Sequence, residues 1–162
     1  MSDKCLSASD GGNAPCYTFG MIKPRATREH LGPILETIVH HGLTIRRMET
    51  RQLGRADAEF LYAEHRGKPF YDALIEYTVS GPVVLLHLTK LGASSAVGFW
   101  RLVMGDSSNA ASSTLRGAYA NPEVKRENAV HGADSPEAAR REIAYFFFGG
   151  RGVDQLNSED FF

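Results

Sequence analysis

The order in which predicted strands and helices alternate constrains the fold of this chain more than any other feature of its sequence. Alternating or continuous apolar residues predict strands over 17–23, 43–53, 83–88 and 128–131. Apolar residues recurring at intervals of three and four predict helices over 31–41, 57–65, 70–79, 96–104 and 136–148. Strand–helix–strand units therefore occur twice in the chain, once near each end.

Capping and turn residues delimit several of these elements. Asp57 is expected to cap the second helix. Ser135 is expected to cap the last helix, with Pro136 at its first position, where the missing backbone N–H costs nothing. Gly105 follows the helix over 96–104, as glycine commonly does. The Ser-, Ala- and Asn-rich segment 106–113 is expected to form a loop.

This order predicts an α+β protein with a ferredoxin-like antiparallel four-stranded sheet and helices packed on one face of it. The chain has 162 residues, which suits a single domain with a sizeable core. We expect a flexible N-terminal tail over 1–15, one domain over 16–150 and a C-terminal tail over 151–162, from which Phe161 and Phe162 could dock on the domain. The fold alone does not define a function, because this architecture hosts many.

Composition excludes several classes of protein. The net charge is −1, so a whole-molecule field for nucleic acid or an anionic membrane is not expected. No apolar stretch approaches the roughly 18 residues that a membrane helix needs, and the polar N-terminus lacks a signal region. Cys5 and Cys16 are too few for a disulfide framework and are expected to be incidental thiols. These features predict a cytoplasmic protein.

His131 is the leading candidate for a reactive side chain. It lies between a short predicted strand and a capped helix, beside Gly132, which we expect to allow a sharp turn and leave one side of the ring open. Glu142, on the following helix, can reach back to orient a ring N–H. A neutral, oriented imidazole is a competent nucleophile. The alternative, a turn histidine and a solvated glutamate, is not excluded by the spacing.

Cationic side chains at Lys23, Arg101 and Arg116 are candidates for binding phosphate. Phosphoryl transfer mainly requires positioning and neutralisation of phosphate oxygens, and arginine suits this because its planar group binds two oxygens at once. The alternative is that all three are solvated surface charges. The sequence contains no GxxxxGK[ST] loop, no GxGxxG and no protein-kinase signature.

Five short motifs occur in order between residues 17 and 148. They are MIKP at 21–24, YAEH at 62–65 followed by KPF at 68–70, SGPV at 80–83, TLRG at 114–117 and NAVHGADS at 128–135. Together they resemble the nucleoside diphosphate kinase family, and the last motif is close to a signature by itself. The resemblance covers about four-fifths of the chain.

The resemblance implies a ping-pong reaction in which a nucleoside triphosphate phosphorylates a histidine and a nucleoside diphosphate then accepts the phosphoryl group. It implies that His131 is the nucleophile and that Glu142 holds the far ring nitrogen. It also implies nucleotide-binding roles for Lys23 (sugar hydroxyl and phosphate), Tyr62 (beside the phosphohistidine), Phe70 (stacking on the base), Arg101, Ser107 and Arg116 (phosphates) and Asn128 (ribose).

The resemblance further implies Mg²⁺ carried on the nucleotide phosphates rather than in a protein cage. Stacking tolerates any base, so purine and pyrimidine nucleotides are both expected to bind. Nucleoside di- and triphosphates are the expected partners, with neither membrane nor nucleic acid. A homo-oligomer is expected, with a hexamer favoured and a dimer or tetramer possible.

Three departures from the family pattern stand out. Ala133 replaces the usual serine, which leaves Glu142 with one partner fewer. The segment 105–114 is shorter than in the family, where this loop packs around the axis of the oligomer. The phosphate-binding hydroxyl then corresponds to Ser107, or to Ser108 if the missing residues are placed elsewhere in the segment. Two extra residues lie between Arg116 and Asn128.

Two other functions stay open at this point. The first is a divergent member that binds nucleotide for regulation, with weak or no turnover, because Ala133 and the altered loops would loosen the site. The second is an unrelated ferredoxin-like module such as an RNA-binding domain. The strand over 17–23 lacks the spaced aromatic residues that such a module uses to stack bases, which disfavours the second alternative.

Overall fold

The computed structural model describes residues 15–149 and 156–161 and contains one four-stranded sheet. The strands are β1 (Tyr17–Ile22), β2 (Thr44–Arg51), β3 (Val83–Thr89) and β4 (Val130–Gly132). Their order is β2-β3-β1-β4, and every neighbouring pair is antiparallel. The predicted ferredoxin-like sheet is confirmed, although β4 begins at Val130 rather than at residue 128.

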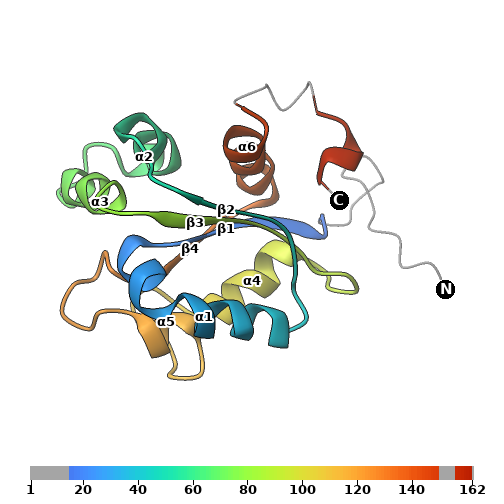
Figure 1. The fold of residues 1–162 in the computed structure, drawn as a ribbon, viewed down its shortest axis with the longest axis horizontal. Helices are drawn as coiled ribbons and strands as arrows, with labels where there is room; N and C mark the ends of the chain where they lie inside the picture. Colours follow the sequence, from blue (N-terminus) through green and yellow to red (C-terminus); the bar gives the residue numbers. More distant parts are fainter. Residues whose placement is uncertain (1–14, 150–155, 162) are drawn as a thin grey trace.

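Helices cover both faces of this sheet, so the expectation of helices on one face is wrong. Figure 1 shows α2 (Arg55–Leu61), α3 (Tyr71–Thr78) and α6 (Pro136–Phe147) on one side. The opposite side carries α1 (Pro24–His40), α4 (Ala96–Met104) and α5 (Leu115–Tyr119). The physical reason lies in β1 and β3, which are buried at every position; a strand buried on both faces reads as a continuous apolar run.

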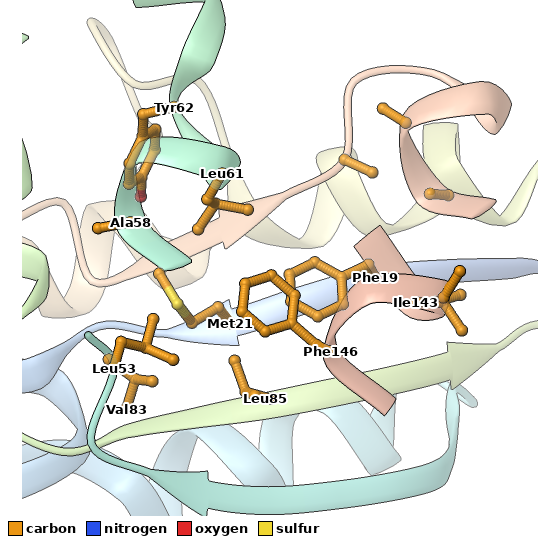
Figure 2. Packing of buried hydrophobic residues seen from close by; sticks show 14 of the residues in the cluster. Phe19, Met21, Leu53, Ala58, Leu61, Tyr62, Val83, Leu85, Ile143 and Phe146 are labelled. Carbon is orange, nitrogen blue, oxygen red and sulfur yellow. The ribbon is translucent and has the colours of Figure 1, made fainter. Parts of the chain in front are cut away.

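Alternate residues of the central strands supply two separate cores. On the α6 side, Phe19 of β1 stacks on Phe146 with ring centroids 5.2 Å apart, beside Met21 and Leu85 (Figure 2). On the other side Ile22 packs with residues of β3, α1 and α4. Burying each such side chain contributes roughly 1.5–3 kcal/mol, so the two cores hold β1, and with it the neighbouring strand β4, in place.

The two predicted helix caps have different outcomes, and one helix was not predicted. Ser135 caps α6 as predicted, because its hydroxyl oxygen accepts a hydrogen bond from the backbone N–H of Ala138. The prediction that Asp57 caps α2 is wrong: α2 begins at Arg55, and the Asp57 carboxylate accepts from the backbone N–H of Gly54 at 2.9 Å. Helix α5 was not predicted, because five residues are too few for an apolar period, although Thr114 caps it.

The ends of the described chain pack against one another. Phe161 is fully buried and stacks on Tyr17 at 4.9 Å. Cys16 is disulfide-bonded, so the expectation of an incidental thiol there is wrong. The predicted tails over 1–15 and 151–162 lie mostly outside the described residues, as does Phe162. No helix in the described part of the chain is long and apolar enough to cross a membrane.

Candidate active site

His131 and Glu142 form the centre of the site. β4 pairs with β1 so that His131 lies opposite Met21, and α6 brings the Glu142 carboxylate back over the strand. Nε2 of His131 lies 3.0 Å from Oε1 of Glu142, and the side chains are only 15% and 5% exposed. The carboxylate can only accept, so in the neutral ring Nε2 carries the proton and the lone pair of Nδ1 is left available.

Two aromatic rings fix the orientation of the imidazole. The Tyr62 ring meets His131 edge-on at 5.5 Å, and the Phe19 ring does so at 6.0 Å. Burial, followed by the nearby Glu142 carboxylate, raises the pKa of the Tyr62 hydroxyl. The phenol therefore stays protonated at neutral pH.

Gly132 is required for close packing rather than for a turn. A Cβ at this position would lie 2.5 Å from Cε of Met104 and 2.6 Å from Nε1 of Trp100, both on α4. The backbone of Gly132 is not in the left-handed region, so the expected sharp turn is wrong. The strained backbone is instead at Ala129, whose φ is +73°, two residues before His131.

A cavity of about 530 Å³ opens beside His131. All nine predicted site residues line it: Lys23, Tyr62, Phe70, Arg101, Ser107, Arg116, Asn128, His131 and Glu142. Ser107 lines the cavity, whereas the Ser108 hydroxyl donates to the carboxylate of Asp106. Phe70 is 51% exposed, which leaves its ring accessible at the mouth.

Two of the cations in the cavity, the buried Lys23 and the half-buried Arg116, are positioned by carbonyl groups. Nζ of Lys23 donates to the backbone oxygen of Arg126 at 3.2 Å, and burial, then the charge of Arg116, lowers the pKa of Lys23 to about 7. Arg116 donates to the carbonyls of Gly105 and Val130 at 2.9 and 3.1 Å. Burial and the neighbouring Arg101 lower the pKa of Arg116, so an anion placed here relieves repulsion between cations.

Several polar residues of the cavity were not identified from the sequence. These are Glu64, His65, Lys125, Arg126, Asp134 and Arg141. His65 accepts from Nζ of Lys68 at 3.0 Å, and its pKa is lowered by burial and then by that lysine. The only signal for Lys125 and Arg126 was the extra length of their loop, since isolated charges carry no spacing that predicts a site.

Comparison with known proteins identifies what the chain is similar to. A sequence model of the family described as nucleoside diphosphate kinase matches residues 17–150. A protein named nucleoside diphosphate kinase from Actinobacillus pleuropneumoniae is 41% identical over 133 residues. That match spans 80% of this chain and 93% of the relative.

Solved structures give the same result. A crystal structure of the nucleoside diphosphate kinase of Aquifex aeolicus superposes with a TM-score of 0.73 at 30% identity, covering 81% of this chain and 94% of that one. The apo enzyme of Encephalitozoon cuniculi superposes with a TM-score of 0.72 at 27% identity, covering 90% of this chain and 95% of that one.

Proposed function

Because the chain belongs to the nucleoside diphosphate kinase family, a family of phosphotransferases, we propose that it carries the transferred phosphoryl group on His131. The contact between Nε2 of His131 and Glu142 carries this proposal, because it leaves Nδ1 as the nucleophilic atom. Glu142 also stabilises the positive charge that the ring gains during attack.

The reaction has two half-steps. In the first, the Nδ1 lone pair forms a bond to the γ-phosphorus of a nucleoside triphosphate. The bond from that phosphorus to the bridging oxygen breaks, and the nucleoside diphosphate leaves with the electron pair. In the second, a terminal oxygen of an acceptor diphosphate attacks the phosphorus, and the N–P bond returns its electrons to Nδ1.

The remaining lining residues bind the nucleotide. Arg101 and Arg116 neutralise the phosphates, with Ser107 as a further hydroxyl donor. Lys23 contacts sugar hydroxyl and phosphate, and Asn128 contacts the ribose. Phe70 stacks on the base at the mouth, and Tyr62 lies beside the phosphohistidine.

The donor set around the cavity fits Mg²⁺ held mainly by the nucleotide. The lining is rich in cations, and of its three carboxylates, Glu64, Asp134 and Glu142, the last is in contact with His131. The described residues include no group of three or more ligating side chains. When bound, the ion would supply charge neutralisation at the nucleotide phosphates, and Asp134 would be the lining carboxylate available to help hold it.

We infer that the chain acts as a homo-oligomer, with a hexamer favoured over a dimer or tetramer. β2 is an edge strand of the sheet, and Met48 on it is 54% exposed, which supports pairing with another copy. Light scattering measures this state directly.

We also propose one transferring domain over 16–150, flanked by terminal segments 1–15 and 151–162. A cytoplasmic location is proposed because free nucleoside di- and triphosphates with Mg²⁺ are available there. The disulfide at Cys16 is unusual in that compartment, so the redox state of this cysteine in cells, measured by alkylation, tests the location.

The second candidate function is nucleotide binding without turnover, and the unpartnered Oε2 of Glu142 is the observation that favours it. Incubation with γ-labelled ATP separates the two functions. The proposal expects a labelled protein that loses its label when unlabelled GDP is added. A protein that binds ADP but acquires no label supports the regulatory alternative.

A further inference from the structure

Lys125 and Arg126 are two cations of the cavity to which the proposed reaction assigns no role. Both line the cavity that contains His131, and both are exposed to solvent. Neither side chain makes an ion pair or hydrogen bond with another residue in 15–149 or 156–161. We refer to them as the basic pair.

The loop that carries the basic pair has a defined shape. The backbone N–H of Asn121 donates to the carbonyl of Glu127 at 2.9 Å, and the Asn121 amide donates to the Glu127 carboxylate at 2.8 Å. The N–H of Glu127 donates to the carbonyl of Val124 at 2.9 Å. The loop is therefore closed by its own hydrogen bonds, which leaves the two cationic side chains available to a ligand.

The neighbours of the basic pair along the chain, and one contact of its backbone, associate it with the sugar side of the proposed nucleotide site. Along the chain Arg126 is followed by Asn128, proposed for the ribose, and then by His131. The carbonyl of Arg126 also accepts from Nζ of Lys23, proposed for the sugar and phosphate. The phosphate end is occupied instead by Arg116, which the carbonyls of Gly105 and Val130 hold. The basic pair therefore adjoins the sugar and base end of the nucleotide.

We propose that Lys125 and Arg126 donate hydrogen bonds to the base and make this site prefer guanine nucleotides. The inference rests on the proposed nucleotide site. Guanine presents two neighbouring acceptors, O6 and N7, which are the groups that arginine and lysine bind best on a base edge. Adenine offers N7 beside an amino donor, and cytosine offers an amino donor on that edge. Stacking on Phe70 cannot make this distinction.

The test compares the dissociation constants of four diphosphates by calorimetry. The ligands are GDP, IDP, ADP and CDP, and the proteins are wild type and the double variant Lys125→Ala/Arg126→Ala. IDP shares O6 and N7 with GDP but lacks the 2-amino group. The matched control is Arg28→Ala/Arg66→Ala, which removes the same charge from exposed positions outside the cavity.

The proposal expects the Lys125/Arg126 variant to bind GDP and IDP about three- to tenfold more weakly, with CDP changed less than twofold and the control unchanged. An equal loss of affinity for all four ligands would mean that the pair attracts phosphates, and would overturn the proposed preference for guanine. Unchanged binding of every ligand would overturn it as well. A wild-type protein that binds none of the four would instead refute the nucleotide site itself.

Discussion

One buried oxygen, Oε2 of Glu142, has no hydrogen-bond partner among the described residues. Its carboxylate is committed through Oε1 to Nε2 of His131. Buried carboxylate oxygens are normally satisfied, and an unsatisfied polar group costs about 1–3 kcal/mol. Ala133, where the family usually has serine, is buried in the core beside α6. The missing hydroxyl and the unsatisfied oxygen therefore point to the same defect in the orientation of His131.

Ala133→Ser is expected to leave the rate of phosphohistidine formation unchanged or to raise it by up to about threefold, since a hydroxyl can donate to Oε2. Single-turnover labelling measures this rate. Ala133→Cys is the matched control, because it is similar in size but a weak donor. A large loss of rate in the serine variant alone would contradict the role given to Glu142.

We expect Lys23 to couple nucleotide binding to proton uptake. Its pKa in the free protein is about 7, so at pH 8 the amine is mostly neutral. A bound phosphate raises that pKa, and binding must then take up a proton. Affinity for ADP is therefore highest below pH 7 and falls by up to about tenfold per pH unit above it, until the pKa of the complex is reached.

Calorimetry in two buffers of different ionisation enthalpy measures this uptake at pH 8. Lys23→Arg is the control. Because arginine stays protonated, the proton uptake that accompanies ADP binding is expected to vanish in this variant. Binding by the wild-type protein without proton uptake would show that Lys23 is already charged in the free protein.

At the scale of elements, a histidine ties the last described segment to the sheet. His87 on β3 is fully buried; its Nδ1 accepts from Arg47 of β2, and its Nε2 donates to the carbonyl of Phe161. Both contacts are 2.8 Å long, and they require a neutral ring, because arginine can only donate. Burial, then the charge of Arg47, lowers the pKa of His87 to about 4.

Folding stability should therefore fall as the pH decreases. His87 has a folded pKa below its unfolded value of about 6.5, so its contribution is complete above pH 6.5 and is lost toward pH 4. Between pH 7 and 4.5 we expect the free energy of unfolding to decrease by about 2–3 kcal/mol through this residue. Urea unfolding at both pH values measures it.

His87→Gln should remove the pH-dependent part of the free energy of unfolding that we assign to His87. Glutamine can also accept a hydrogen bond from Arg47 and donate one to Phe161, but it does not titrate. An identical loss of stability in wild type and variant would place the pH dependence elsewhere.

The elements also show why some features could be predicted and others could not. α4 begins and ends as predicted, since Ser95 and Gly105 bound a clear apolar period. α1 begins at Pro24 rather than at residue 31, because its first turns carry few apolar residues. The one-face arrangement was wrong although the continuous apolar run of β3 indicated burial on both faces.

At the scale of the whole molecule, the site combines residues that are distant in the sequence. The motifs contain six of the nine predicted lining residues, because each motif fixes a type of side chain at a fixed spacing. The other three, Arg101, Ser107 and Glu142, lie outside the motifs and were assigned by the resemblance to the family. Lys125 and Arg126 were missed because they belong to an inserted loop whose course only the fold defines. Gly132 was identified for the wrong reason, since its contacts with α4 are tertiary.

The central claim is that Nδ1 of His131 carries the phosphoryl group. Its most direct test is ³¹P nuclear magnetic resonance of the protein after reaction with ATP, since phosphate on the two ring nitrogens gives different signals. His131→Ala, shown to be folded by circular dichroism, is the control. The account predicts one signal from phosphate on Nδ1, absent in the variant. A signal from phosphate on Nε2, or one that persists in His131→Ala, would contradict it.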